Sequence, residues 1–389
     1  IKKKFWNFLL RKLMTNLKKP EKICQRCVMD SSVKEIIFYP DGRCSLCRNY
    51  DENLSKEIHV DQQGKERFKK LIKVVKKTKK GKYDCLIGIS GGVDSSFVAH
   101  LVKMYELNPL AVHLDNGWNT ELAVDNVEKL VKELKIDLYT EVLNWNEFKS
   151  IQKSFLLSSI SNIEIPTDHA IWATLAKIAK KEKIKYIFAG NNVVTESIMP
   201  ESWLYHSKDF RLIKAINKKF GKKNISSFPR LSLFDYFYLF IFRGIRWVPV
   251  LNYFDYIKED AKKTLIDQYG WRDYGGKHYE SIFTRFFHAF YLPKKFGYDL
   301  RKSYLSALIC SNQITRDEAL MELSQPPADE KQLIHDVEYV KKKLNFSNEE
   351  FENMIDQPTK SFKDYPNNDF LWTRFSDFVS ILRSYITRV

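Results

Sequence analysis

Residues 84–100, DCLIGISGGVDSSFVAH, constrain the fold of this chain more than any other stretch. An apolar run breaks at Ser90-Gly91-Gly92 and passes at once into a helical pattern. Two glycines let backbone N–H groups point inward, and the positive N-terminal end of the following helix attracts negative charge. This order of strand, glycine pair and helix predicts a binding site for phosphate.

The side chains of the loop indicate which kind of phosphate ligand binds there. A Walker loop requires a lysine after its second glycine, and a dinucleotide fold requires GxGxxG; the stretch has neither pattern. Instead, Ser90, Ser95 and Ser96 supply hydroxyls, and Asp94 supplies a carboxylate. This set suits a phosphate chain that binds together with Mg²⁺.

Short apolar runs alternate with helical patterns after the loop. They predict strands at 83–89, 110–115, 137–143 and 185–190, and helices at about 95–106, 120–134 and 167–181. The alternation is typical of an α/β fold with a parallel, doubly wound sheet that helices cover on both faces. Ligands bind such sheets at the carboxyl ends of the strands, where Asp115 and Asn191 stand.

Four of the six cysteines form two C-x2-C pairs, Cys24 with Cys27 and Cys44 with Cys47. Their spacing is typical of a zinc ribbon, and the turn at residues 39–42, YPDG, would return the second pair to the first. Zinc would hold together a segment that has too little apolar surface to fold alone. An iron–sulfur cluster uses the same ligands and stays an alternative, whereas a cytoplasmic chain disfavours disulfides.

Composition bounds the rest of the chain. Its 389 residues, 44% of them hydrophobic, can bury the cores of two or three domains. We expect a cytoplasmic protein, because no stretch reaches the roughly 20 apolar residues that cross a bilayer and the first residues lack a cleavage site. The net charge of +16 indicates an anionic partner without choosing among nucleic acid, membrane and nucleotide.

Four regions are predicted along the chain. They are a basic amphipathic helix at 1–20, a four-cysteine zinc ribbon at 21–58, the phosphate-binding α/β domain at 59–230, and a mostly helical region for substrate and partner binding at 231–389. Residues 1–19 could rest on a membrane surface, on a partner or on their own domain. The two remaining cysteines, Cys85 and Cys310, stand in apolar contexts and are expected to be inert core thiols.

The loop Ser90-Gly91-Gly92-Val93-Asp94-Ser95 resembles the SGGxDS motif of the pyrophosphate-loop ATP pyrophosphatases. This superfamily includes GMP, NAD and asparagine synthetases and tRNA-thiolating enzymes. Its members cleave ATP between the α and β phosphates, so that a substrate oxygen is adenylated and pyrophosphate leaves. The resemblance implies that the loop binds ATP, that Asp94 also acts in catalysis and holds Mg²⁺, and that His113 and Asp115 lie against the adenosine. Asn191 and Glu196 would face the reacting centre or Mg²⁺, although a strand-end asparagine is often only a turn former.

Further motifs resemble the N-acetyl sugar amidotransferase family. They are the cysteine pairs in ICQRCVMD and DGRCSLC, the loop SGGVDSS, and the segments GWRDYGGKHYESIFTRF (270–286) and LPKKFGYDLRKSYLSALICSNQITRDEAL (292–320). The resemblance covers most of residues 21–325. It implies an enzyme that converts an acetamido group on a nucleotide-linked sugar into an acetamidino group for surface polysaccharide or flagellar glycan. Adenylation turns the amide oxygen into part of a leaving group, and ammonia then replaces AMP.

Basic residues of the 270–301 segment would complete the site electrostatically. The candidates are Arg272, Lys277, His278, Arg285, Lys294, Lys295 and Arg301. Lys277 is the first choice as a catalytic and ATP-binding residue, because the neighbouring Gly275-Gly276 brings the backbone close to a ligand. His278 and Glu280 are candidates for sugar binding or proton transfer, with a structural role at a helix start as the alternative.

The sequence indicates where the ammonia comes from. A glutaminase needs a nucleophilic cysteine at a chain start or on a strand-to-helix elbow, and neither Cys85 nor Cys310 has that setting. We therefore expect a separate class I glutamine amidotransferase subunit that delivers ammonia through a protected channel.

Two other functions fit part of the sequence. A tRNA-thiolating enzyme also combines cysteine pairs, a pyrophosphate loop and a basic surface, but such enzymes generally need a sulfur-carrying cysteine near the ATP site. All four paired cysteines here are committed to one closed site, so nucleic acid is not the expected partner. A zinc-ribbon scaffold on a degenerate nucleotide fold is the other possibility, and the intact Asp94, Ser95 and Ser96 argue against it.

Overall fold

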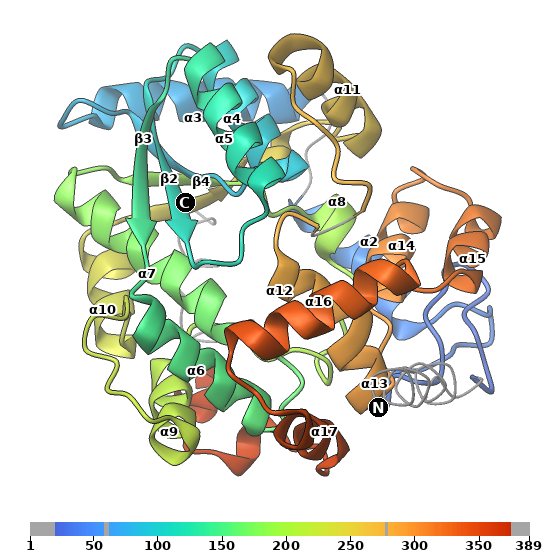
Figure 1. The fold of residues 1–389 in the computed structure, drawn as a ribbon. Coiled ribbons are helices and arrows are strands. Elements are labelled where there is room, and N and C mark those ends of the chain that lie inside the picture. The colour runs from blue at the N-terminus through green and yellow to red at the C-terminus, as the bar shows by residue number, and fades with distance from the viewer. Residues whose placement is uncertain (1–19, 58–61, 277–278, 375–389) are drawn as a thin grey trace.

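A layered α/β core forms the centre of the molecule, with a cysteine module and a helical region beside it (Figure 1). The computed structural model describes residues 20–57, 62–276 and 279–374. The predictions for Lys277, for His278 and for a helix over residues 1–19 therefore lie outside the described residues. The core elements are α3 (Gln62–Thr78), β1 (Cys85–Gly88), α4 (Val93–Met104), β2 (Pro109–Asp115), α5 (Glu121–Glu133), β3 (Asp137–Val142), α6 (Trp145–Leu157), α7 (Ile165–Lys181), β4 (Tyr186–Ala189) and β5 (Arg246–Pro249).

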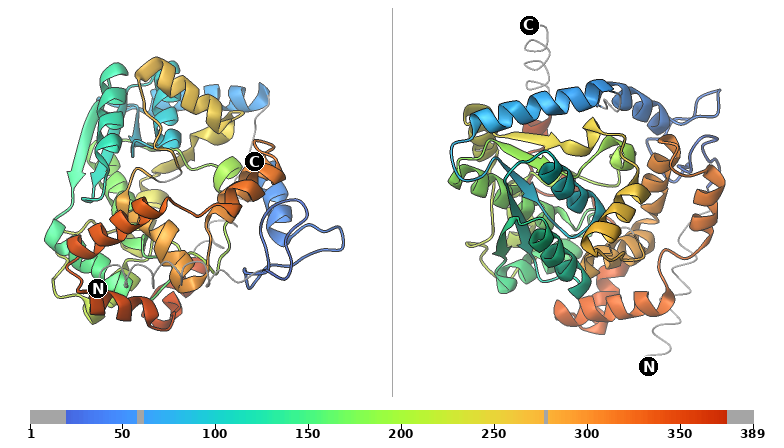
Figure 2. Two further views of the ribbon diagram at one scale, coloured as in Figure 1. Left: turned by 45° about the vertical axis from the view of Figure 1, so that its right-hand side comes forward. Right: turned by 90° about the horizontal axis from the view of Figure 1, so that it is seen from above.

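The sheet has five parallel strands in the order β3-β2-β1-β4-β5. Alternate residues of the central strand face opposite layers, as the pleat requires. Cys85 and Ile87 pack in a cluster with residues of α3, α4 and α5, whereas Leu86 packs in a cluster with residues of α7. The two layers can be followed from two further directions in Figure 2. The predicted parallel, doubly wound sheet and its four predicted strands are thus confirmed.

The fifth strand corrects a predicted boundary. β5 pairs with β4 from Tyr186 opposite Arg246 to Ala189 opposite Pro249, although it lies in the range 231–389 that was expected to be mostly helical. The strand has only four residues and ends at a proline, so its pattern does not stand out within an aromatic run. The α/β domain therefore extends past residue 230 and includes β5.

Helices make up most of the remaining chain. They are α8 (Val193–Glu196), α9 (Phe210–Phe220), α10 (Leu233–Phe237), η1 (Tyr238–Phe242), η2 (Val250–Tyr253), α11 (Lys258–Tyr269), α12 (Ile282–Phe286), η3 (Phe287–Tyr291), α13 (Leu292–Phe296), α14 (Arg301–Cys310), α15 (Arg316–Ser324), α16 (Glu330–Lys343), α17 (Asn348–Asp356) and η4 (Phe362–Asp364). The predicted cap of α15 is confirmed, because Thr315 and Glu318 form a reciprocal capping box. Among the described residues, no helix has both the length and the apolar character that a membrane crossing requires.

The cysteine module comprises residues 20–57 and ends in α2 (Ser45–Glu57), which lies beside α14 and α15 at the right of Figure 1. Three kinds of contact fix it there. The Val28 N–H donates to Ser306 Oγ at 3.2 Å, and Lys302 forms an ion pair with Asp30. The Arg316 guanidinium donates to the carbonyls of both cysteines in the first pair, at 3.1 and 3.2 Å. The module is therefore an integral part of the fold.

Candidate active site

The glycine loop begins directly after β1 and ends at the N-cap of α4, which is Gly92. Within it, Ser90 Oγ and Ser95 Oγ share a hydrogen bond of 3.1 Å, and the Gly92 N–H donates to Ser90 Oγ at 3.3 Å. Gly91 has φ of +85°, a conformation that costs side-chain-bearing residues energy. The hydroxyls and the helix end therefore meet as the sequence predicted for a phosphate site.

The segment before residue 277 holds the loop in this shape. Trp271 Nε1 and the Tyr274 hydroxyl both donate to the Gly91 carbonyl at 2.8 Å. Asn126 donates to the Tyr274 hydroxyl at 3.0 Å, which links the segment to α5. The predicted association of residues 270–276 with the loop is present, but aromatic donors make the contact.

Asp94 is fixed by a residue from another part of the chain. The Tyr256 hydroxyl donates to Asp94 Oδ1. Burial, and then the Asp94 charge, raises the pKa of Tyr256 far above its usual value, so the phenol keeps the proton that it donates. On the other side, a Cβ added to Gly190 would lie 2.9 Å from the backbone of Asp94 and Ser95, so β4 can approach only without a side chain.

A cavity with two lobes opens over the loop. The first lobe, about 670 Å³, runs along the ends of β1, β2 and β4, and the second, about 730 Å³, runs toward α11 and α14. Both lobes are lined by the same group of predicted site residues: Ser90, Ser95, Asn191, Glu196 and Glu280. His113 lines the first lobe alone, and Gly92 and Asp94 line the second. The structure thus brings together most of the predicted site.

Three predicted residues lie behind the cavity lining. Asp115 accepts a hydrogen bond from the Gly117 N–H at 2.8 Å, and Ser96 is buried within α4. Gly91 turns its carbonyl to Trp271. His113, by contrast, donates from Nδ1 to the Ile89 carbonyl at 2.8 Å and accepts at Nε2 from Asn119 at 3.0 Å. These partners assign the neutral Nδ1–H tautomer to His113.

Two carboxyl groups in the first lobe were missed by the sequence analysis. Glu164 is the N-cap of α7, and Asp168 lies in its first turn. Burial, and then repulsion from Asp168 and Glu280, raises the pKa of Glu164 to about 8. Burial and the nearby Glu196 raise the pKa of Asp168 to about 7. Perturbed carboxyls in a cleft are typical of functional sites, and the two acids spaced i, i+4 at an apolar helix start were the available signal.

Several basic candidates of the 270–301 segment form ion pairs or hydrogen bonds within the fold, and Arg285 and Arg301 also line the second lobe. Arg285 is 9% exposed and donates to the fully buried Asp336 at 2.5 and 2.8 Å. Arg301 pairs with Asp299 at 2.7 Å, and the exposed Arg272 pairs with Asp125 at 2.6 Å. Lys295 donates to backbone carbonyls of α17 and its end, and burial lowers its pKa to about 8. The sequence pattern does not reveal that these basic side chains have partners within the fold.

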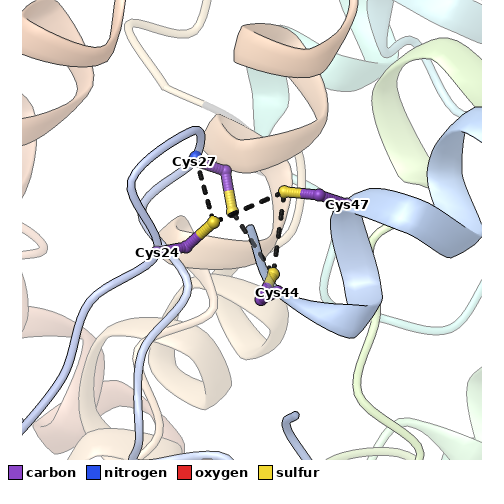
Figure 3. Close-up of side chains that lie close together, drawn as sticks. All are labelled: Cys24, Cys27, Cys44 and Cys47. Atoms are coloured by element: carbon purple, nitrogen blue, oxygen red, sulfur yellow. Dashed lines mark hydrogen bonds between the residues drawn. The ribbon is translucent and has the colours of Figure 1, made fainter. Parts of the chain in front are cut away.

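The four paired cysteines converge on one buried point (Figure 3). The Sγ atoms of Cys24 and Cys47 lie 3.7 Å apart, those of Cys27 and Cys44 3.8 Å, and those of Cys44 and Cys47 3.6 Å. Zn–S bonds of about 2.3 Å place tetrahedral sulfurs about 3.8 Å apart, so the geometry is compatible with zinc. All six cysteines lie within the described residues and are unbridged, as the sequence predicted.

The two remaining cysteines differ in their surroundings. Cys85 is fully buried in β1, and burial raises the pKa of its thiol, as expected of an inert core residue. Cys310 was expected to resemble it, but its Sγ lies 3.9 Å from Cys47 Sγ. The end of α14 thus borders the cysteine site, because the module packs on this helix; the separation in sequence hid this contact.

Comparisons with known proteins agree with this geometry. Residues 65–161 match the NAD synthase family, and residues 280–379 match the family described as LPS biosynthesis protein WbpG-like, C-terminal domain. A curated relative, the uncharacterized protein MJ1599 of Methanocaldococcus jannaschii, is 32% identical over 121 residues. That match covers 30% of this chain, and the chain spans only 40% of the length of that relative.

A comparison with solved structures also found partial similarities. NMN synthetase from Francisella tularensis is 20% identical over 48% of this chain and 73% of its own, with a TM-score of 0.27. A predicted subunit of tRNA methyltransferase from Methanocaldococcus jannaschii is 14% identical over 46% and 74%, with a TM-score of 0.28. NH3-dependent NAD synthetase from Campylobacter jejuni is 14% identical over 77% and 98%, with a TM-score of 0.30.

The loop at the end of β1, in a parallel sheet with a matched NAD synthase domain, defines the class of protein. The core is a pyrophosphate-loop ATP pyrophosphatase domain, of the type found in ATP-dependent amidating ligases. The WbpG-like domain follows it in the same chain. The two matches, over residues 65–161 and 280–379, support a relation to the N-acetyl sugar amidotransferase (WbpG-like) family of the pyrophosphate-loop superfamily.

Proposed function

We propose that this chain is the synthetase subunit of a cytoplasmic, ATP-dependent amidotransferase that acts in lipopolysaccharide and O-antigen synthesis. Its substrate would be a nucleotide-linked sugar whose acetamido group becomes an acetamidino group. The observation that carries the proposal is the pyrophosphate loop at the junction of two lobes of about 670 and 730 Å³. Each volume is within the range of small-molecule pockets, so ATP and a second substrate can meet at the loop.

The first step forms an adenylate. The acetamido oxygen attacks the α phosphorus of ATP, the bond to the β phosphate breaks, and pyrophosphate leaves. Backbone N–H groups at Gly92 and the start of α4 stabilise the charge that develops there. Asp94 and Glu196 both line the second lobe and offer the oxygen ligands that Mg²⁺ prefers. Mg²⁺, when bound, would neutralise negative charge on pyrophosphate.

The second step replaces oxygen by nitrogen. Ammonia adds to the carbon of the adenylated amide, and the C–O bond then breaks to release AMP. His113, which is held as the neutral tautomer, supports binding of an uncharged group such as the adenine base in the first lobe. Lys277 and His278 stay candidates for contact with the phosphates and the sugar.

We propose that a class I glutamine amidotransferase supplies the ammonia through a channel. In support, all six cysteines are buried, and none has the setting of a glutaminase nucleophile. We further propose Zn²⁺ as the ion of the cysteine site, with a structural role, because four protein thiolates close its coordination shell. If the purified chain used glutamine as efficiently as ammonium chloride, the partner would be unnecessary.

An oxygen label tests the central reaction. The chain is incubated with ATP, Mg²⁺, ammonium chloride and a panel of UDP-linked acetamido sugars that carry ¹⁸O in the acetamido group. We expect AMP and pyrophosphate in equal amounts, with the label recovered in AMP. ADP in place of AMP, or AMP without label, would contradict the adenylation step. AMP formation that instead requires tRNA and a sulfur donor would favour the thiolating enzyme.

A further inference from the structure

One face of α7 lines the first lobe of the cavity. Glu164, Thr167, Asp168, Ile171 and Thr174 all contribute to the lining, and their i, i+3, i+4 spacing places them on one side of the helix. The other acids of this lobe, Glu196 and Glu280, come from separate elements. Among its described lining residues, the first lobe has no lysine or arginine. The second lobe has Lys258, Lys262, Arg285 and Arg301.

The same helix face presents buried polar atoms without partners. The hydroxyls of Thr167 and Thr174 accept and donate no hydrogen bond among the described residues, although these residues are only 8% and 2% exposed. Glu164 Oε1 is unpartnered in the same sense. Native proteins rarely leave buried polar groups unsatisfied, so these atoms are available to bind a ligand or water in the lobe.

The spacing of the acidic side chains indicates which kind of ligand the first lobe can bind. Among the described residues, only the four paired cysteines form a group of three or more side chains close enough together to hold a metal ion. No three carboxyls of the first lobe therefore lie near enough to share a divalent cation. A lobe with several acids, neutral hydroxyls and no cationic side chain among its described residues instead suits a small cation that donates hydrogen bonds in several directions.

We propose that Glu164 and Asp168 form the ammonia site, holding incoming ammonium and taking its protons. The inference rests on the proposed function and identifies where its nitrogen enters. Ammonium carries four hydrogens, whereas the amidino NH2 carries two, so two protons must leave this nitrogen. One leaves before its lone pair forms the C–N bond, and the other leaves before the C–O bond to AMP breaks. Each of the two carboxyl groups accepts one proton when it is in its ionised form. Burial holds the pKa of both groups near neutrality, which suits proton transfer.

A comparison of two nucleophiles distinguishes a catalytic role of Glu164 and Asp168 from a structural one. Ammonium must lose two protons in the reaction, whereas hydroxylamine is mostly unprotonated at neutral pH and must lose only one. In Glu164→Gln and Asp168→Asn, ammonium-dependent AMP formation should fall about 100-fold. Hydroxylamine-dependent AMP formation should fall less than ammonium-dependent AMP formation, and exchange of labelled pyrophosphate into ATP should stay near the wild-type rate. Glu182→Gln, at the C-cap of the same helix, is the matched control and should not change either rate.

The result that overturns the inference is a parallel loss with both nucleophiles, which indicates a structural role, or unchanged use of ammonium. A second measurement does not depend on the sugar. Ammonium chloride should raise the unfolding temperature of the wild type above its value in equimolar potassium chloride, and the Glu164→Gln, Asp168→Asn double variant should lose that difference. An equal difference in both proteins would also overturn the site. Absence of AMP with every sugar, together with the expected salt effect, would reject the proposed reaction but not the ammonium site.

Discussion

The cysteine module and the pyrophosphate loop are both short irregular segments, yet different parts of the sequence determine their shapes. The four thiols of the module come from residues 24–47 and converge by local turns. The loop is held from more than 160 positions away, by Tyr256 on Asp94 and by Trp271 and Tyr274 on the Gly91 carbonyl. The first site is closed and buried, whereas the second opens onto a cavity. A structural ion requires local closure, and a reacting substrate requires an open site that the rest of the fold keeps rigid.

Loss of the metal should have the largest effect and confirm that the module is closed locally. Structural zinc sites contribute on the order of 10 kcal/mol to folding. Cys24→Ser should therefore release the metal and expose residues 20–57 to limited proteolysis, with metal content measured by mass spectrometry. Cys85→Ala is the control and should keep one equivalent of metal. Full metal content in Cys24→Ser would show that the site is not the one described.

Substitutions at the pyrophosphate loop should lower the activity of the enzyme without unfolding the protein. Asp94→Asn keeps the volume of the side chain but removes the charge, so AMP formation should fall by about 10³-fold while the unfolding temperature changes little. Tyr256→Phe removes only the donor to Asp94 and should cause a much smaller loss of AMP formation. Comparable activity of Asp94→Asn and the wild type would remove Asp94 from the mechanism.

The contribution of distant residues to the shape of the loop can be tested by measuring KM for ATP. Trp271→Phe deletes one of the two donors to the Gly91 carbonyl, a loss of about 1 kcal/mol, and should raise KM for ATP by up to about 5-fold. Trp203→Phe is the matched control, because this buried indole N–H has no partner among the described residues. An unchanged KM in Trp271→Phe would indicate that the loop keeps its shape without the contact.

The smallest expected effect is a difference in how the stability contributed by Glu164 and by the cysteine module depends on pH. Burial and repulsion by Asp168 and Glu280 raise the pKa of Glu164 to about 8, although a hydrogen bond from Thr284 offsets part of the shift. The folded state therefore holds the Glu164 proton more tightly than the unfolded chain, and stability declines as pH rises from about 5 to about 8. Thermal melts of Glu164→Gln should show a flatter decline and a higher unfolding temperature at about pH 8. The cysteine module should behave oppositely, because acid protonates its thiolates and releases the metal.

Local patterns were sufficient to predict much of the fold and part of the site. The alternation of apolar runs predicted β1 to β4, and the SGGVDSS motif predicted the phosphate loop at the end of β1. β5 was missed because a four-residue strand has too little periodicity. Tyr256 was missed because nothing near it in the sequence refers to the loop. The segment that contains Trp271 was expected at the site for its basic residues, and only the folded topology shows that its aromatic side chains contact the loop. The ion pair of Arg285 was not predicted, because its partner, Asp336, lies 51 positions further along the chain.

The helix α14 limits how this protein could be divided or recombined. Near its first turn Leu300, Ser303 and Tyr304 line the cavity, whereas Ser306 and Cys310 contact the cysteine module. A shortened chain that begins near residue 58 would lose the cover over one face of this helix, and the wall of the substrate cavity would change. Exchange of the module between relatives would succeed only if α14 were exchanged with it. The smallest unit that keeps these contacts is therefore the module together with a helix about 250 positions away in the chain.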